Sequence, residues 1–125
     1  MKKKFLPLLF AATLFAGCSS ITNLTPSQLP RNAGGVYTVE AGWRTEQQSI
    51  RPTSVKPSVM IGMESYPMRP VPLVRDRWEA VIPVAAEKDA TYYRFRFDYL
   101  VNAIPVPHAD SKLSPEYKLQ IVDKK

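Results

Sequence analysis

Prolines are spread so evenly along this chain that long helices are excluded from most of it. The sequence has 125 residues and 12 prolines, and all but Pro7 follow residue 17, at positions 26, 30, 52, 57, 67, 70, 72, 83, 105, 107 and 115. A proline inside a helix removes a backbone hydrogen bond, clashes with the preceding turn and costs about 3 kcal/mol or more. Only residues 31–51 and 84–104 leave room for a long helix, and both windows show a strand pattern instead.

Alternation of apolar and polar side chains is clearest over residues 91–100, where Tyr93, Phe95, Phe97 and Tyr99 alternate with charged or polar residues. A period of two places one set on the inner face of a strand and the other in water. The same reasoning predicts strands over 21–25, 36–44, 55–63, 66–69, 77–84, 91–100 and 117–122, with a polar hairpin turn over 85–90.

Seven short strands separated by turn residues predict an all-β fold, a single antiparallel β-sandwich. Over residues 21–122 the order of strands resembles immunoglobulin-like and fibronectin-like domains. The chain lacks the Cys…Trp…Cys spacing of antibody domains, because Cys18 is its only cysteine. The resemblance therefore concerns the architecture of an immunoglobulin-like domain over 21–125.

The N-terminus has the order of a secretory signal. Lys2, Lys3 and Lys4 precede an apolar run over 5–15, and small residues follow up to Cys18. The run is too short to cross a bilayer comfortably, since a spanning helix needs about 20 apolar residues. Residues 1–17 are therefore predicted to be a signal peptide that is removed, not a part of the fold.

The segment Leu14-Phe15-Ala16-Gly17-Cys18 resembles the lipobox of bacterial lipoproteins, although Phe15 stands where leucine is usual. The resemblance implies that the signal peptide is cut before Cys18 and that Cys18 carries acyl chains on its thiol and its new amine. Ser19, rather than Asp, follows the cysteine, which in Gram-negative lipoproteins implies export to the outer membrane. Residues 18–20 are then a lipidated N-terminus and short tether. Residues 21–34 are open to two interpretations, a first strand or a longer tether, and Ile21, Leu24 and Leu29 favour the strand.

Charge gives little support to a nucleic-acid partner. The chain has a formal net charge of +6, from 17 Lys and Arg against 11 Asp and Glu. Removal of the signal peptide takes three lysines with it and leaves a net charge of +3, which is only weakly basic.

No catalytic or metal-binding constellation stands out, so neither an enzyme activity nor a cofactor is expected. His108 is the sole histidine and lies in a proline-rich segment predicted to be a solvated loop. Carboxylate pairs for glycoside hydrolysis can be drawn from Glu79 with Asp98, or Glu40 with Glu64. All four fall on outward or edge faces of predicted strands, where a solubilising role is expected.

Partner contacts are predicted at Tyr66, Arg69, Arg75 and Arg77. The three arginines form a basic cluster that suits acidic groups, such as lipid phosphates or peptidoglycan carboxylates, or simply keeps a loop soluble. Tyr66, next to Pro67, is expected to be exposed in a loop.

The sequence therefore predicts a non-enzymatic envelope lipoprotein that is lipid-anchored in the outer membrane and has a structural or protein-interaction role. Its partner is an unidentified envelope protein or glycan. The alternative is a surface carbohydrate-binding module that stacks sugars on aromatic rings. In that case Trp43 and Trp78 would have to leave the core face on which their strands place them.

Overall fold

The computed structural model describes residues 19–46 and 49–123, and nearly all of its regular structure is β-strand. One 3₁₀ turn, η2, covers Pro52–Ser54. No helix in the described residues has the length and apolarity that crossing a membrane requires. The strands are β1 (Ser19–Asn23), β2 (Gln28–Pro30), β3 (Val36–Thr45), β4 (Lys56–Ile61), β5 (Glu64–Pro67), β6 (Arg69–Pro70), β7 (Arg77–Pro83), β8 (Ala90–Val101), β9 (His108–Leu113) and β10 (Tyr117–Val122).

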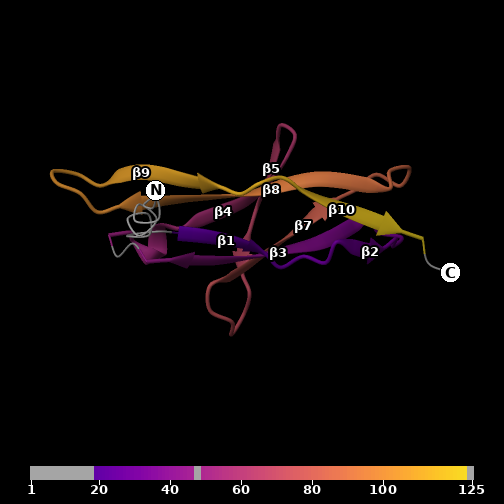
Figure 1. Cartoon of the computed structure of the whole chain (residues 1–125), viewed down its shortest axis with the longest axis horizontal. Helices are drawn as coiled ribbons and strands as arrows, with labels where there is room; N and C mark the ends of the chain where they lie inside the picture. The colour runs from indigo at the N-terminus through magenta and orange to yellow at the C-terminus, as the bar shows by residue number, and fades with distance from the viewer. Residues whose placement is uncertain (1–18, 47–48, 124–125) are drawn as a thin grey trace, which may run out of the picture.

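The strands form two sheets packed face to face (Figure 1). One sheet has the order β1-β3-β7-β6, and the other has the order β2-β10-β8-β4-β5, with β9 also paired to β8. All pairs are antiparallel except β2 with β10, which is parallel. The predicted antiparallel sandwich is confirmed with this one parallel pair, which arises because the chain crosses from one sheet to the other after β1 and keeps its direction.

This strand order is that of an immunoglobulin-like sandwich. In that fold, strands A, B, E and D form one sheet and C, F and G form the other. Here β1, β3, β7 and β6 take the places of A, B, E and D, while β4, β8 and the β9–β10 pair take those of C, F and G. The predicted fold class is confirmed, although ten strands are present among the described residues where seven were expected.

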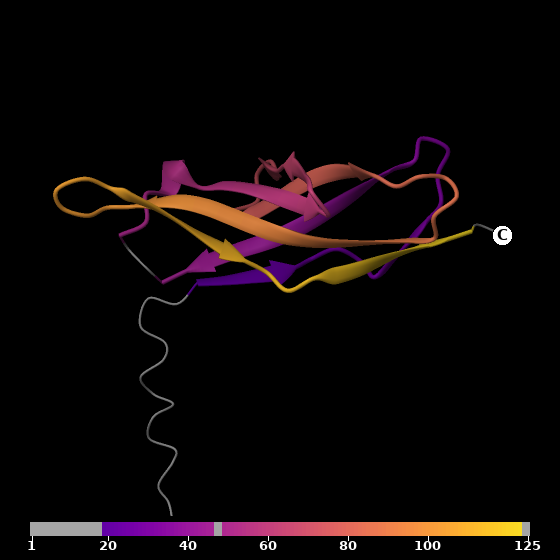
Figure 2. The same cartoon turned by 90° about the horizontal axis from the view of Figure 1, so that it is seen from above.

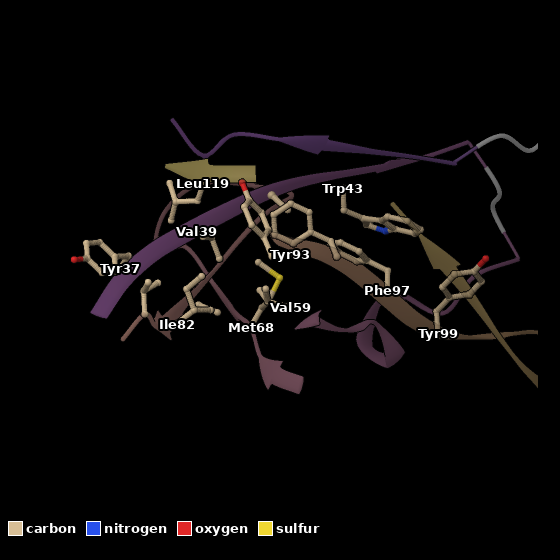
Figure 3. Packing of buried hydrophobic residues seen from close by; sticks show 14 of the residues in the cluster. Tyr37, Val39, Trp43, Val59, Met68, Ile82, Tyr93, Phe97, Tyr99 and Leu119 are labelled. Atoms are coloured by element: carbon tan, nitrogen blue, oxygen red, sulfur yellow. The ribbon is translucent and has the colours of Figure 1, made fainter. Parts of the chain in front are cut away.

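The core lies between the sheets and is rich in aromatic rings (Figure 3). The inward face of β8 supplies Tyr93, Phe95, Phe97 and Tyr99, all buried as the alternation predicted. Trp43 of β3 stacks on Phe97 with ring centroids 4.7 Å apart and an angle of 9° between the planes. Antibody domains join the corresponding two strands by a disulfide. In this chain a stacked aromatic pair connects the sheets instead.

Three sequence-based boundaries need correction. The strand expected over 66–69 is divided at buried Met68, whose N–H donates to the Pro57 carbonyl as the chain passes from β5 in one sheet to β6 in the other. Residues 85–90 do not form a hairpin turn, because β7 and β8 belong to different sheets. Met63, the last residue of the strand expected over 55–63, is fully exposed because β4 ends at Ile61, before a turn where Gly62 has φ of 58°.

Strand β9 was not predicted. It pairs with the second half of β8, β10 pairs with the first half, and buried Ser114 lies between them. The Ser114 N–H donates to the Phe95 carbonyl at 2.9 Å, and its Oγ accepts the Phe95 N–H at 2.8 Å. Ser114 thereby provides hydrogen-bond partners for the backbone N–H and carbonyl of Phe95 in β8, at the point where Pro115 interrupts the last strand. His108, expected in a loop, is the first residue of β9, although it is exposed as predicted.

Candidate functional site

The first candidate site is the end of the sandwich at which β1 begins, which we call the anchor end. Cys18 itself lies outside the described residues, but Ser19 is already part of β1 and pairs with Thr45 of β3. Further along, Ile21 lies opposite Trp43, so the N-terminal strand is tied to the core. β1 (Ser19–Asn23) and β2 (Gln28–Pro30) therefore occupy much of the segment that was open to two interpretations, and Ser19, next to Cys18 in the sequence, already belongs to a strand.

The loop joining β8 to β9, residues 102–107, projects from the same end (Figure 2). Ile50 forms a bridge with Val101, and the Asn102 N–H donates to the Ser49 carbonyl at 2.7 Å. Arg51 Nε donates to Asn102 Oδ1 at 2.5 Å. These contacts hold the base of the loop against the segment that follows β3. At its tip, Ile104 is 98% exposed and Val106 is 63% exposed.

A cleft of about 480 Å³ lies beside this end. Its lining is mostly apolar or aromatic but also includes charged residues, and it contains Trp43, Ile50, Val74, Trp78, Arg44 and Arg77. Trp43 is only 6% exposed because Phe97 covers its ring, whereas Trp78 is half-buried. Both tryptophans therefore pack as core residues, as their strand faces predicted.

The predicted basic cluster is largely neutralised by carboxylates. Arg69 pairs with Glu79 at 3.3 Å, and Arg77 Nε lies 2.7 Å from Glu40 Oε2. The buried Arg77 Nε has no acceptor aligned for a hydrogen bond, so this short contact is ionic rather than a directed bond. Glu40 and Glu79 face each other across β3 and β7. The four side chains thus form a strip on the outer face of that sheet, in which an arginine at each end offsets two neighbouring carboxylates.

The remaining two predicted contact residues lie apart from this strip. Arg75 is exposed in the loop between β6 and β7 and makes no ion pair within residues 19–46 and 49–123. Tyr66 does not lie in a loop: it belongs to β5, on the edge of the other sheet, and is half-buried. Its hydroxyl donates to Glu64, and this hydrogen bond raises the pKa of the Tyr66 phenol, with smaller contributions from burial and the Glu64 charge. The structure brings Arg69 and Arg77 onto one face but does not assemble all four residues.

The carboxylates considered as possible catalytic pairs are engaged elsewhere. Glu40 and Glu79 hold arginines, Asp98 pairs with Arg96 at 2.9 Å, and Glu64 accepts from Tyr66. In the part of the chain that the structure describes, no group of three or more His, Cys, Asp or Glu side chains could hold a metal ion.

The opposite end of the sandwich, the distal end, is joined by polar contacts around Arg31. Its guanidinium donates to Asp123 and Asp89, each at 2.6 Å, and to the carbonyls of Ala86 at 2.8 Å and Lys88 at 3.1 Å. The hydrogen bond to Asp123 is the main cause that raises the pKa of Arg31, while partial desolvation opposes it. Arg31 therefore links the β7–β8 connection to the end of β10.

Comparison with known proteins adds little to this assignment. No protein-family model matches the chain, and no curated protein is similar to it in sequence at a significant level. A solved structure of murine CRIg is similar over 85% of this chain and 99% of that chain, with 13% sequence identity and a TM-score of 0.41. The fold assignment therefore rests on the strand order described above.

Proposed function

We propose that this chain is a non-enzymatic lipoprotein of the bacterial cell envelope, held in the outer membrane by acyl chains on Cys18. The observation that supports this most is the junction at residue 18. A basic, then apolar, segment ends in the lipobox-like Leu14-Phe15-Ala16-Gly17-Cys18, and the first strand of the domain starts at Ser19. Each buried methylene of an acyl chain contributes about 0.8 kcal/mol, and two or more chains give stable anchoring.

The role of the sandwich is structural or protein-binding rather than catalytic. Its carboxylates serve in ion pairs at the surface, and the cleft beside Trp78 is lined mainly by apolar side chains. A cleft lined by tryptophans and aliphatic side chains together with arginines resembles the composition of protein interfaces, in which aromatic residues and arginine are enriched. An envelope protein is therefore the partner class that we favour.

A carbohydrate-binding role is supported by one observation, the presence of Trp43 and Trp78 in the same cleft. Sugar stacking needs an accessible ring face, however, and one face of Trp43 lies against Phe97. Tyr66 lies on the edge strand of the other sheet and adds nothing to this cleft. A glycan array with the full-length protein distinguishes the two roles: binding that Trp78→Ala abolishes would favour the glycan.

The anchor is tested by replacing Cys18 with alanine in the full chain. We expect Cys18→Ala to lose all incorporation of labelled palmitate and to accumulate as a precursor or a soluble form. Phe15→Leu is the matched control, because it changes the same segment toward the usual lipobox and should keep the label. Density-gradient fractionation then shows whether the labelled protein lies in the outer membrane. Mass spectrometry of the native protein that found residues 1–17 intact and an unmodified sulfur would overturn the proposal.

A further inference from the structure

We infer that the β8–β9 loop, residues 102–107, is a second membrane contact, in which Ile104 and Val106 enter the same lipid surface that holds Cys18. This inference rests on the proposed anchor and adds to it a second site of contact. The inferred partner of this apolar tip is the headgroup and upper acyl region of a bilayer, and nothing in the described residues covers the tip.

The tip combines ordinary loop residues with two large apolar ones and no charge. Residues 102–107 read Asn-Ala-Ile-Pro-Val-Pro. Gly, Pro, Asn, Asp and Ser dominate turns, and Asn102, Pro105 and Pro107 are of this kind, whereas Ile104 and Val106 are not. Isolated exposed apolar side chains are common and need no explanation. Here, however, two large ones project from one tip, Ile104 almost completely and Val106 by more than half.

Other exposed apolar residues of the molecule differ from this pair in their surroundings. Met63 stands alone at the turn between β4 and β5 and is followed by Glu64. Leu73 lies in a loop that also carries Arg75 and Asp76, whose charges favour water. Among residues 19–46 and 49–123, only the 102–107 tip combines exposed branched side chains with a complete lack of charge and a position at the anchor end.

The position of the tip follows from strand pairing. β3 ends at Thr45, which lies opposite Ser19, and the chain then returns to Ile50, which bridges Val101 at the end of β8. The start of β1 and the start of the loop therefore share one end of the sandwich. Figure 2 shows the loop extending past the start of β1 along the long axis of the molecule. With Ser19 already in β1, acyl chains on Cys18 bring this end to the headgroups, within reach of the tip.

The base of the loop is built to hold the tip in place. Asn102 is fixed from two sides, by Ser49 through its N–H and by Arg51 through its side chain. Pro105 and Pro107 restrict the backbone φ angles between these contacts and β9. Arg51 is itself exposed, so its cation lies at the depth where lipid phosphates would be met if the tip were inserted.

The experiment uses the fact that the chain has a single cysteine. When Cys18 is acylated, Ile104→Cys introduces the only free thiol, which can carry an environment-sensitive fluorophore. The lipidated full-length protein is inserted into vesicles of phosphatidylethanolamine and phosphatidylglycerol, some of which carry spin-labelled acyl chains. Met63→Cys is the matched control, because Met63 is equally exposed but lies away from the anchor end.

We expect the label at 104 to shift to the blue, to be quenched by the spin-labelled lipid and to lose most of its quenching by aqueous iodide. The label at 63 should show none of these changes. A label at 104 that iodide still quenches as fully as the label at 63 overturns the inference. Protection from iodide without quenching by the spin-labelled lipid also overturns it, because the tip then contacts protein, such as a second copy of the chain.

The two proposals fail in distinguishable ways. Mass spectrometry of the same sample reports on Cys18, and the fluorophore reports on the tip. If Cys18 is acylated but iodide still quenches the label at 104, the proposed anchor is supported and the proposed tip contact is contradicted. Unmodified Cys18 removes the anchor, and because its thiol would also take the fluorophore, the tip is then read in the double variant Cys18→Ser, Ile104→Cys with the same vesicles. Quenching by the spin-labelled lipid in that variant keeps the tip contact, and a label that iodide quenches fully removes both.

Discussion

The two ends of the sandwich are built on different principles. At the distal end, Arg31 joins the β7–β8 connection to the end of β10 through four hydrogen bonds to Asp123, Asp89 and two backbone carbonyls. At the anchor end, the loop tip carries Ile104 and Val106 into solvent, and aromatic rings fill the space between the sheets behind it. The distal end is joined by ion pairs around Arg31, whereas the anchor end holds the base of its loop with polar contacts of Asn102 and presents an apolar tip.

This difference shows that exposed apolar surface is not distributed evenly over the molecule. Two connections of similar length cap the ends of β8, residues 84–89 and 102–107. The first contains Glu87, Lys88 and Asp89, and the second contains no charge. Since both connections join the same strand, the sheet itself does not require this contrast, and the proposed lipid contact of the 102–107 loop would account for it.

The largest effect is expected in the aromatic core of the anchor end. Phe97→Ala should lower the free energy of unfolding by about 3–5 kcal/mol, because it removes a fully buried ring and leaves a cavity beneath Trp43. Tyr92→Ala on the outer face of the same strand, where the side chain is 52% exposed, is the control and should change stability by about 0.5 kcal/mol or less. Urea unfolding followed by circular dichroism measures both, and equal losses would contradict the assignment of faces.

A smaller effect is expected at the distal end. Arg31→Met should lower the melting temperature by a few degrees, less than Phe97→Ala does, because the partner carboxylates Asp89 and Asp123 are 79% and 77% exposed and solvent screens the ion pairs. High salt should reduce the difference between Arg31→Met and the original chain. Arg44→Met is the control: Arg44 is an exposed arginine that makes no ion pair among residues 19–46 and 49–123. If Arg44→Met were as destabilising as Arg31→Met, the distal network would have no special role.

The smallest effect concerns Tyr99, whose phenol lies near the anchor end. Burial, and to a lesser extent the charge of Asp110, raise the pKa of Tyr99. Above a pH of about 10, the ordinary pKa of tyrosine, the folded chain keeps this proton while the unfolded chain releases it. The folded state then binds more protons, so stability falls as the pH rises.

Tyr99→Phe should therefore make the alkaline loss of stability shallower, as measured by urea unfolding at several pH values above neutrality. Asp110→Asn should have a smaller effect on the alkaline loss of stability than Tyr99→Phe. It should lower the pKa of Tyr99 only slightly, because burial is the main cause of the shift and persists in this variant. An unchanged slope in Tyr99→Phe would show that this phenol does not contribute to the alkaline transition.

The alternation of side chains predicted the central strands well. The strand expected over 117–122 matches β10, and those over 36–44, 77–84 and 91–100 match β3, β7 and β8 to within a residue at either end. These strands each have one face in the core and one in water, which is the condition under which a period of two is visible. The burial of Trp43 and the half-buried position of Trp78 followed from the same pattern.

The edges of the sheets could not be predicted in the same way. β9 reads His-Ala-Asp-Ser-Lys-Leu and is largely exposed, so no apolar face marks it. β2 has three residues and is positioned by β10, which is distant in sequence. The pairing of Arg69 with Glu79 and of Arg77 with Glu40 depends on which strands become neighbours. For this reason three arginines that form a cluster in the sequence do not form one basic patch in space.

The pairing of β1 with β3 also determines how the domain bears a mechanical load. A pull on residue 18 along the long axis of the molecule acts parallel to β1, from its first residue. Hydrogen bonds between antiparallel strands are perpendicular to the strands, so the five residue pairs from Ser19–Thr45 to Asn23–Ala41 resist sliding together rather than opening one after another. Drag on the domain in this direction is therefore shared along the whole seam between the two strands.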